Sequence, residues 1–355
     1  MARITKNTQL VVPLHEVMTP RFPVIDSHAH FGKLLGVMTN TGEKYFDLYQ
    51  TEDTVAVLRH YGIQHVVNLD GGWGDEYLRV MEKLRSAGDF IFHFGHVDVE
   101  RFEEPDFEQM VYRTIKQHAA NGIKGLKFWK IIGLVIRDKK GKYLRPDDER
   151  LQCIWEAAAE FKLPVLFHIG DLNAFFLPAD ETNEYIETFR EHPEWQFTDP
   201  GLYSFAQLME MQENLLRRNP DTTFIIPHVG SYAENLAQVG KWLDTFPNMY
   251  IDIADRLNEL GRQPYSARAF FNRYADRILF GTDMLPTDME RYPIYYRFLE
   301  TYDEYFSYRT EDGLMLGDWN IYGIGLDDAA LKRVYYDNAA RLLDLKQAGS
   351  DRPPL

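Results

Sequence analysis

Two histidines follow an apolar run near the start of the chain, in the stretch Val24-Ile25-Asp26-Ser27-His28-Ala29-His30. Side chains at positions i and i+2 of a strand lie on the same face, so His28 and His30 can bind one ion. Neutral imidazole is a common ligand of zinc and related divalent metals. Taken alone, the pair is equally consistent with hydrogen-bonded or surface histidines, so its meaning depends on the rest of the chain.

Other side chains with chemical potential stand at or just after the ends of later apolar runs. They are Lys127, His168, His228, Arg256 and Asp283. A histidine or acid that follows a buried run needs a reason to be there, because burying such groups without partners is costly. Together with Asp26, His28 and His30, these residues form a coherent set for a metal-dependent hydrolase. His93 and His96 have no such partners in the pattern and are expected to be structural.

The elements that position these residues are about eight short β-rich runs, each separated from the next by a helical pattern. This alternation is typical of parallel strands joined by crossover helices, and eight units predict an α/β fold of the (β/α)8 TIM-barrel type. In such a barrel the catalytic groups come from the carboxyl ends of different strands. The alternative is an open doubly wound sheet, but the first strand is not followed by a glycine-rich phosphate turn.

We expect one domain over residues 1–355, with a barrel core at about 22–283 and a C-terminal helix at 326–345. Two insertions interrupt the regular spacing, residues 170–200 after the fifth strand and residues 286–325 after the eighth. Both are rich in aromatic residues, and long loops in a compact barrel are usually functional, so both are lid candidates. Decoration of the barrel or an oligomer contact is the alternative.

Composition limits the function. The 355 residues are 45% hydrophobic and carry a net charge of −15, so the chain is globular and lacks the basic surface that a nucleic-acid partner requires. We expect no membrane partner and no membrane span, because no apolar run is long enough. The N-terminus lacks the apolar segment of a secretory signal, so the expected location is the cytoplasm. The single cysteine, Cys153, lies in an amphipathic pattern and is interpreted as a small core residue.

At these residues the sequence resembles the amidohydrolase superfamily, within it the group that includes decarboxylases, hydratases and lactonases. The matching pieces cover nearly the whole chain and are Asp26-Ser-His-Ala-His30, Pro164-Val-Leu-Phe-His168, Ile226-Pro-His-Val-Gly230, Ile278-Leu-Phe-Gly-Thr-Asp283 and Tyr336-Asp-Asn-Ala-Ala-Arg-Leu-Leu343. The resemblance implies a barrel with one divalent metal, most often zinc with manganese as the alternative, bound by His28, His30, His168 and Asp283.

The resemblance also implies roles for the remaining residues. His228 would join the metal shell or contact the substrate and orient water, and Asp283 would also accept a proton. Lys127 lies near the place where a carbamylated lysine bridges two metals in binuclear members. A lysine there can instead bind a substrate carboxylate, and one metal fits the group better.

Arg256 is placed to meet a carboxylate, because a guanidinium offers a planar two-pronged donor; a surface ion pair with Asp255 or Glu259 is the alternative. The first hypothesis is a hydrolase that uses metal-activated water on a lactone, ester or amide bond of a small polar substrate, derived from a carboxylic acid or a carbohydrate. The alternatives are a non-oxidative decarboxylase at the same site and a catalytically silent ligand-binding barrel. This fold often pairs, which leaves a homo-oligomer open.

Overall fold

Eight parallel strands form one sheet in the computed structural model of the protein, which describes residues 9–32, 46–309 and 316–345. The strands follow the chain order from β1 to β8, each pairing with the next. Their bounds are β1 (Val24–Ala29), β2 (Ile63–Asn68), β3 (Ile91–Gly95), β4 (Gly125–Phe128), β5 (Val165–Phe167), β6 (Phe224–Ile226), β7 (Met249–Asp252) and β8 (Ile278–Leu279).

The sheet closes on itself between β8 and β1. The backbone N–H of Ser27 donates to the carbonyl of Phe280 over 2.9 Å, and that of Asp283 donates to the carbonyl of His28 over 2.8 Å. The (β/α)8 barrel predicted from the alternation of apolar runs is therefore confirmed. β5 ends at Phe167, directly before His168, and β6 ends at Ile226, two positions before His228, whereas His28 and Lys127 lie inside β1 and β4.

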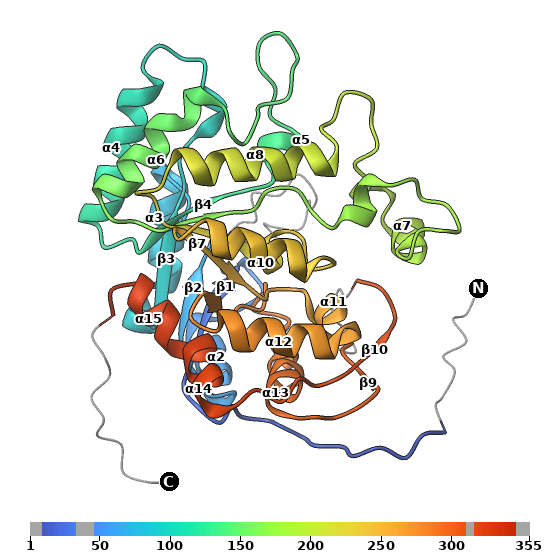
Figure 1. The fold of residues 1–355 in the computed structure, drawn as a ribbon. Coiled ribbons are helices and arrows are strands. Elements are labelled where there is room, and N and C mark those ends of the chain that lie inside the picture. Colours follow the sequence, from blue (N-terminus) through green and yellow to red (C-terminus); the bar gives the residue numbers. More distant parts are fainter. Residues whose placement is uncertain (1–8, 33–45, 310–315, 346–355) are drawn as a thin grey trace.

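Most helices cover the outside of the barrel (Figure 1), whereas the short α9 follows β6 into the site. Their bounds are α2 (Thr51–His60), α3 (Gly74–Leu84), α4 (Phe107–Ala120), α5 (Ile131–Leu134), α6 (Gln152–Glu160), α7 (Ile186–Glu191), α8 (Phe205–Arg218), α9 (Pro227–Gly230), α10 (Leu236–Thr245), α11 (Leu257–Arg262), α12 (Pro264–Tyr274), α13 (Tyr292–Glu300), α14 (Asp328–Lys332) and α15 (Asn338–Leu342). The segment expected as one helix at 326–345 contains α14, a π-helical turn at Arg333–Asp337, and α15. Within the described ranges, no helix is long and apolar enough to cross a membrane.

The barrel interior is apolar at the end opposite the site residues. Buried side chains from the strands fill it together with residues of α15: Ile25, Val67, Leu69, Phe94, Leu166, Ile225, Leu279, Ala339 and Ala340. Such a packed interior closes one end of the barrel and leaves the carboxyl ends of the strands for chemistry. Cys153 of α6, expected in the core, is only half-buried and packs against the outer side of the core.

The two insertions pack against each other. The first contains α7, which lies at the side of the molecule opposite α4 and α6 in Figure 1. The second contains α13 and the antiparallel pair β9 (Phe306–Ser307) and β10 (Asn320–Ile321), while its residues 310–315 lie outside the described part. Side chains of both insertions share one hydrophobic cluster: Leu172, Phe175, Tyr185, Phe189, Trp195 and Leu316. Their role as lids stays a prediction.

Candidate metal centre

His28 in the first strand and His30 just after it are buried, and each is oriented by a carboxylate. Nδ1 of His28 lies 2.8 Å from Oδ2 of Asp252, and Nδ1 of His30 lies 2.9 Å from Oδ1 of Asp70. These acids can only accept when ionised, so the imidazoles donate from Nδ1 and present Nε2 to the site. A carboxylate behind each imidazole is the usual second layer of a metal site.

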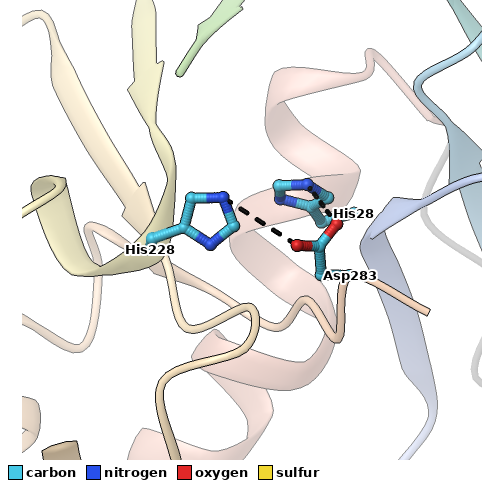
Figure 2. Close-up of side chains that lie close together, drawn as sticks. All are labelled: His28, His228 and Asp283. Atoms are coloured by element: carbon cyan, nitrogen blue, oxygen red, sulfur yellow. Dashed lines mark ion pairs between the residues drawn. The ribbon is translucent and has the colours of Figure 1, made fainter. Parts of the chain in front are cut away.

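Asp283 is the point at which the histidines converge. Its Oδ1 lies 3.1 Å from Nε2 of His28 and 2.9 Å from Nε2 of His30, and its Oδ2 lies 4.0 Å from Nε2 of His228. Figure 2 shows the imidazoles of His28 and His228 directed toward this carboxylate. Burial opposes its ionisation, but His28 and His30 hold the pKa of Asp283 well below its usual range. Asp283 is therefore an anion.

Close approach of the eighth strand to the first depends on a glycine. A Cβ added at Gly281 would lie 2.9 Å from the Cβ of His28, which is closer than real Cβ atoms approach. The backbone of Asp283 then turns into the left-handed region at φ 61°. Non-glycine residues seldom adopt this conformation, and it clusters at functional sites. The Gly-Thr-Asp segment thus brings the carboxylate over the histidines.

His228 is presented by a left-handed turn that follows β6. Residues His228, Val229 and Ser231 have φ values of 56°, 58° and 59°. The N–H of His228 donates to Oδ1 of Asp252 over 2.8 Å, and its Nδ1 lies 2.8 Å from the carbonyl oxygen of Ala254. Burial lowers the pKa of His228 to about 3, so the ring is neutral and its Nε2 carries a lone pair.

His168 lies beside His228, with ring centroids 4.4 Å apart. Burial, together with the positive charges of Lys130 and Lys127, holds the pKa of His168 well below its usual value. The Nε2 atoms of both rings are buried and have no hydrogen-bond partner among the described residues. Among the described residues, His28, His228 and Asp283 form a group whose metal-ligating atoms all lie within 4.8 Å of one another. The structure thus brings the expected catalytic histidine into this group, and places His30 and His168 beside it.

These side chains fit a divalent metal. At His168 and His228, two buried imidazole nitrogens have no hydrogen-bond partner among the described residues, and buried polar atoms are ordinarily paired. The Nε2–H groups of His28 and His30 donate hydrogen bonds to Asp283, and a bound cation would take the place of these protons. Nitrogen donors with one carboxylate are the usual set of a catalytic zinc site, and similar sets bind manganese.

Lys127 of β4 is 1% exposed, and its Nζ has no hydrogen-bond partner within the described part of the chain. Burial lowers its pKa to about 8, although the charges of Asp283, Asp252 and Asp70 oppose that change. The ammonium lies 4.5 Å from the ring centroid of Trp129, whose ring in turn lies 5.1 Å from that of His30. Lys127 therefore adjoins the histidine cluster.

Arg256 lies in the interior, which differs from the surface ion pair considered above. Its Nη2 donates to Asp171 over 3.2 Å and its Nη1 to the carbonyl of Asp255 over 2.6 Å, while Lys130 also pairs with Asp171. Arg256 is 3% exposed; its burial opposes the charged form, but the surrounding acids, Glu259 first among them, raise the pKa of the guanidinium above its ordinary value. Two of its three nitrogens are thus already bonded.

Three residues of the site were missed. Asp70 and Asp252 stand at the ends of apolar runs, which is the same signal that identified the histidines, and Trp129 follows Lys127 by two positions. Asp26 is buried and accepts hydrogen bonds from Thr282 and Tyr292, so it supports the site without entering it. His96 donates from Nε2 to the carbonyl of Leu69, in line with the expected structural role.

Comparison with known proteins shows which protein family the chain matches. The family model described as Amidohydrolase matches residues 25–345. A search of curated proteins found no match. Similar solved structures include a dihydroxybenzoic acid decarboxylase from a Polaromonas species with bound manganese and 2-nitroresorcinol, with 15% identity, coverage of 92% of this chain and 98% of that one, and a TM-score of 0.56.

Two further solved structures resemble the chain to the same degree. One is a 2,6-dihydroxybenzoate decarboxylase in complex with 2,6-dihydroxybenzoate, with 16% identity, coverage of 91% and 99%, and a TM-score of 0.54. The other is an amidohydrolase from Burkholderia multivorans with bound HEPES, with 12% identity, coverage of 92% and 100%, and a TM-score of 0.54. At such identities these structures show a common fold.

Proposed function

Because the chain belongs to the amidohydrolase family, we propose that it is a metal-dependent hydrolase that cleaves a lactone, ester or amide bond of a small polar substrate. The observation that carries the proposal is the convergence of His28 and His30 on one oxygen of Asp283. Burying three metal-ligating side chains together lowers stability, and a silent binding barrel would have no use for them. The silent barrel is therefore the weaker alternative.

His28, His30, His168 and Asp283 would bind one divalent ion, zinc or manganese. When bound, the ion supplies Lewis acidity, which polarises a carbonyl group and makes water more acidic. Oδ1 of Asp283 faces His28 and His30, whereas Oδ2 faces His228. Oδ2 is therefore the atom to accept the proton of the attacking water and return it to the leaving oxygen or nitrogen.

His228 would orient that water. Its Nδ1–H is held by the carbonyl of Ala254, so its Nε2 can accept a hydrogen bond but cannot donate one. The hydrogen bond from Nδ1 to the carbonyl of Ala254 also holds the ring in this orientation. Lys127 and Arg256 remain the cations nearest to a substrate anion, and Lys127 has the greater capacity because Nη1 and Nη2 of Arg256 are engaged.

A decarboxylase is the second candidate. Two of the similar solved structures are dihydroxybenzoate decarboxylases, one of them with manganese. In that reaction the chain's Asp283 would first accept a proton from water and then deliver it to the carbon that loses carbon dioxide. A salt bridge between Lys127 and the departing carboxylate would stabilise the reactant more than the transition state, which favours hydrolysis.

Metal content, measured by elemental analysis on protein purified without a histidine tag, is the first test. About one ion per chain supports the proposal, and about two would indicate a carbamylated Lys127 that bridges them. No metal after reconstitution would reject it. Lactones, esters, amides and carboxylic acids are then screened with wild-type protein and Asp283→Asn. Release of carbon dioxide in place of hydrolysis products would identify the lyase.

A further inference from the structure

The carboxylate of Asp26 joins the two segments that carry the candidate metal ligands. Its Oδ1 accepts the backbone N–H of His28 over 3.0 Å and that of Thr282 over 3.2 Å. Its Oδ2 accepts the hydroxyl of Thr282 over 2.5 Å and that of Tyr292, the first residue of α13, over 2.7 Å. A carboxylate offers about four lone-pair sites, so Asp26 is fully engaged. Asp26 therefore fixes β1 against the turn that bears Asp283.

A second tyrosine of α13 contacts the same turn. The hydroxyl of Tyr295 accepts the backbone N–H of Asp255 over 2.9 Å and lies 3.4 Å from the carbonyl oxygen of Thr282. Asp255 and Asp283 have left-handed backbones, with φ values of 49° and 61°. Non-glycine residues persist in this conformation only where the surrounding structure holds them. Tyr295 thus ties the turn after β7 to the turn after β8.

The turn that bears Asp283 needs support from outside the sheet. β8 spans only Ile278–Leu279, so Asp283 lies beyond the end of the strand. Tyr292 and Tyr295 are at most 1% exposed, and removal of either hydroxyl would leave buried polar groups unpaired. The second insertion therefore supplies, through α13, hydrogen bonds that the short strand cannot.

We propose that Tyr292 and Tyr295 are positioning residues, which hold the carboxylate of Asp283 against the imidazoles that it faces at the metal centre. The inference rests on the proposed function, because Asp283 is both a metal ligand and the proton acceptor there. Tyr292 acts through Asp26, whereas Tyr295 acts on the carbonyl group directly before Asp283. α13 is in this way a fixed support of the site and not a moving lid.

Tyr296 of the same helix provides a matched control. It is as buried as Tyr292, but its hydroxyl donates to the carbonyl of Tyr61 over 2.9 Å, near the amino end of β2 and away from the site. Tyr292→Phe, Tyr295→Phe and Tyr296→Phe each remove one buried hydroxyl and keep the ring. We therefore expect all three variants to lose similar amounts of overall stability in urea denaturation.

Hydrogen–deuterium exchange of the metal-free proteins tests the support directly. Amides of residues 280–284 should exchange roughly 10-fold faster in Tyr292→Phe and Tyr295→Phe than in Tyr296→Phe, as the loss of one hydrogen bond implies. Exchange in β4 serves as the internal reference. Zinc affinity, measured by competition with a chelator, is the readout that a merely structural role would not change. It should fall by about 10-fold or more in Tyr292→Phe and Tyr295→Phe, and should match wild type in Tyr296→Phe.

The outcomes separate the positioning role from the proposed reaction. Zinc affinities in Tyr292→Phe and Tyr295→Phe equal to that of Tyr296→Phe would overturn the proposal, even if exchange were faster. If Tyr292→Phe does not fold, Thr282→Val takes its place, since it removes the other hydroxyl that donates to Oδ2 of Asp26. If wild-type protein binds no metal after reconstitution, the hydrolase is rejected, and the exchange comparison alone decides whether the tyrosines hold the turn.

Discussion

The carboxylate of Asp252 accepts a hydrogen bond from Nδ1 of His28 over 2.8 Å. Its other oxygen accepts the backbone N–H of His228 over 2.8 Å and that of Ala254 over 3.1 Å. Although burial opposes ionisation, His28 lowers the pKa of Asp252, which keeps it an acceptor. One buried acid thus orients an imidazole of β1 and the turn that follows β6.

Replacing Asp252 by Asn should weaken metal binding by about 10- to 100-fold, as other outer-shell changes do. The amide oxygen can still accept the N–H groups of His228 and Ala254, but its NH₂ group cannot accept from His28. His28 would then donate from Nε2 and lose its lone pair toward the site. Competition with a chelator measures the affinity, with the exposed Asp276→Asn as the control. Unchanged affinity in a folded Asp252→Asn protein would refute the orienting role.

His168→Ala should lower the bound metal by at least the factor of about 10 to 100 that outer-shell changes cause. Its buried Nε2 has no other partner among the described residues, so little but metal binding should be lost. Elemental analysis after dialysis gives the stoichiometry. The exposed His60→Ala is the matched control. Full metal content in His168→Ala would remove this residue from the ligand set.

Stability should depend on pH through Glu259. Burial raises its pKa to about 7 from the ordinary 4.5, so between these values the folded state binds more protons than the unfolded state. Stability should therefore fall as pH rises through this range, by roughly 3 kcal/mol in total. Glu259→Gln should flatten the change, because an amide does not titrate, while its oxygen can still accept the hydrogen bond from Tyr185.

Urea denaturation at several pH values between 4.5 and 8 measures this slope. Glu184→Gln is the control, since that carboxylate is 41% exposed and pairs with Arg262. The same slope in Glu259→Gln and wild type would show that Glu259 is not the responsible group.

Phe175→Ala should loosen both insertions together. Phe175 is 2% exposed and packs against Tyr185 and Phe189, so its truncation should cost about 3 to 5 kcal/mol. Because Leu316 belongs to the same cluster, limited proteolysis should become faster in 170–200 and in 286–325 alike. Leu177→Ala, at a side chain that is 47% exposed, should leave both rates unchanged. Faster cleavage of only the first insertion would show that the two are independent.

The sequence by itself determined the barrel fold and most of the polar residues of its site. Apolar runs with the strand period reflect burial, which is a local property, and polar residues at their ends stand out against it. His28, His30, His168, His228, Lys127 and Asp283 were found in this way. Asp70 and Asp252 carried the same signal, but an acid at a strand end is common enough to be passed over.

Only the tertiary structure decided which of these groups touch. His28 and Asp252 are 224 positions apart, and their contact depends on closure of the barrel and on the register of its strands. The same closure buries Arg256 among acids and leaves Nζ of Lys127 without a hydrogen-bond partner in the part of the chain that the structure describes. The residue types along the chain define which chemistry is available. The pairing of charges in a buried site depends on distances of a few ångströms between residues far apart in sequence, and a local sequence pattern carries no information about these distances.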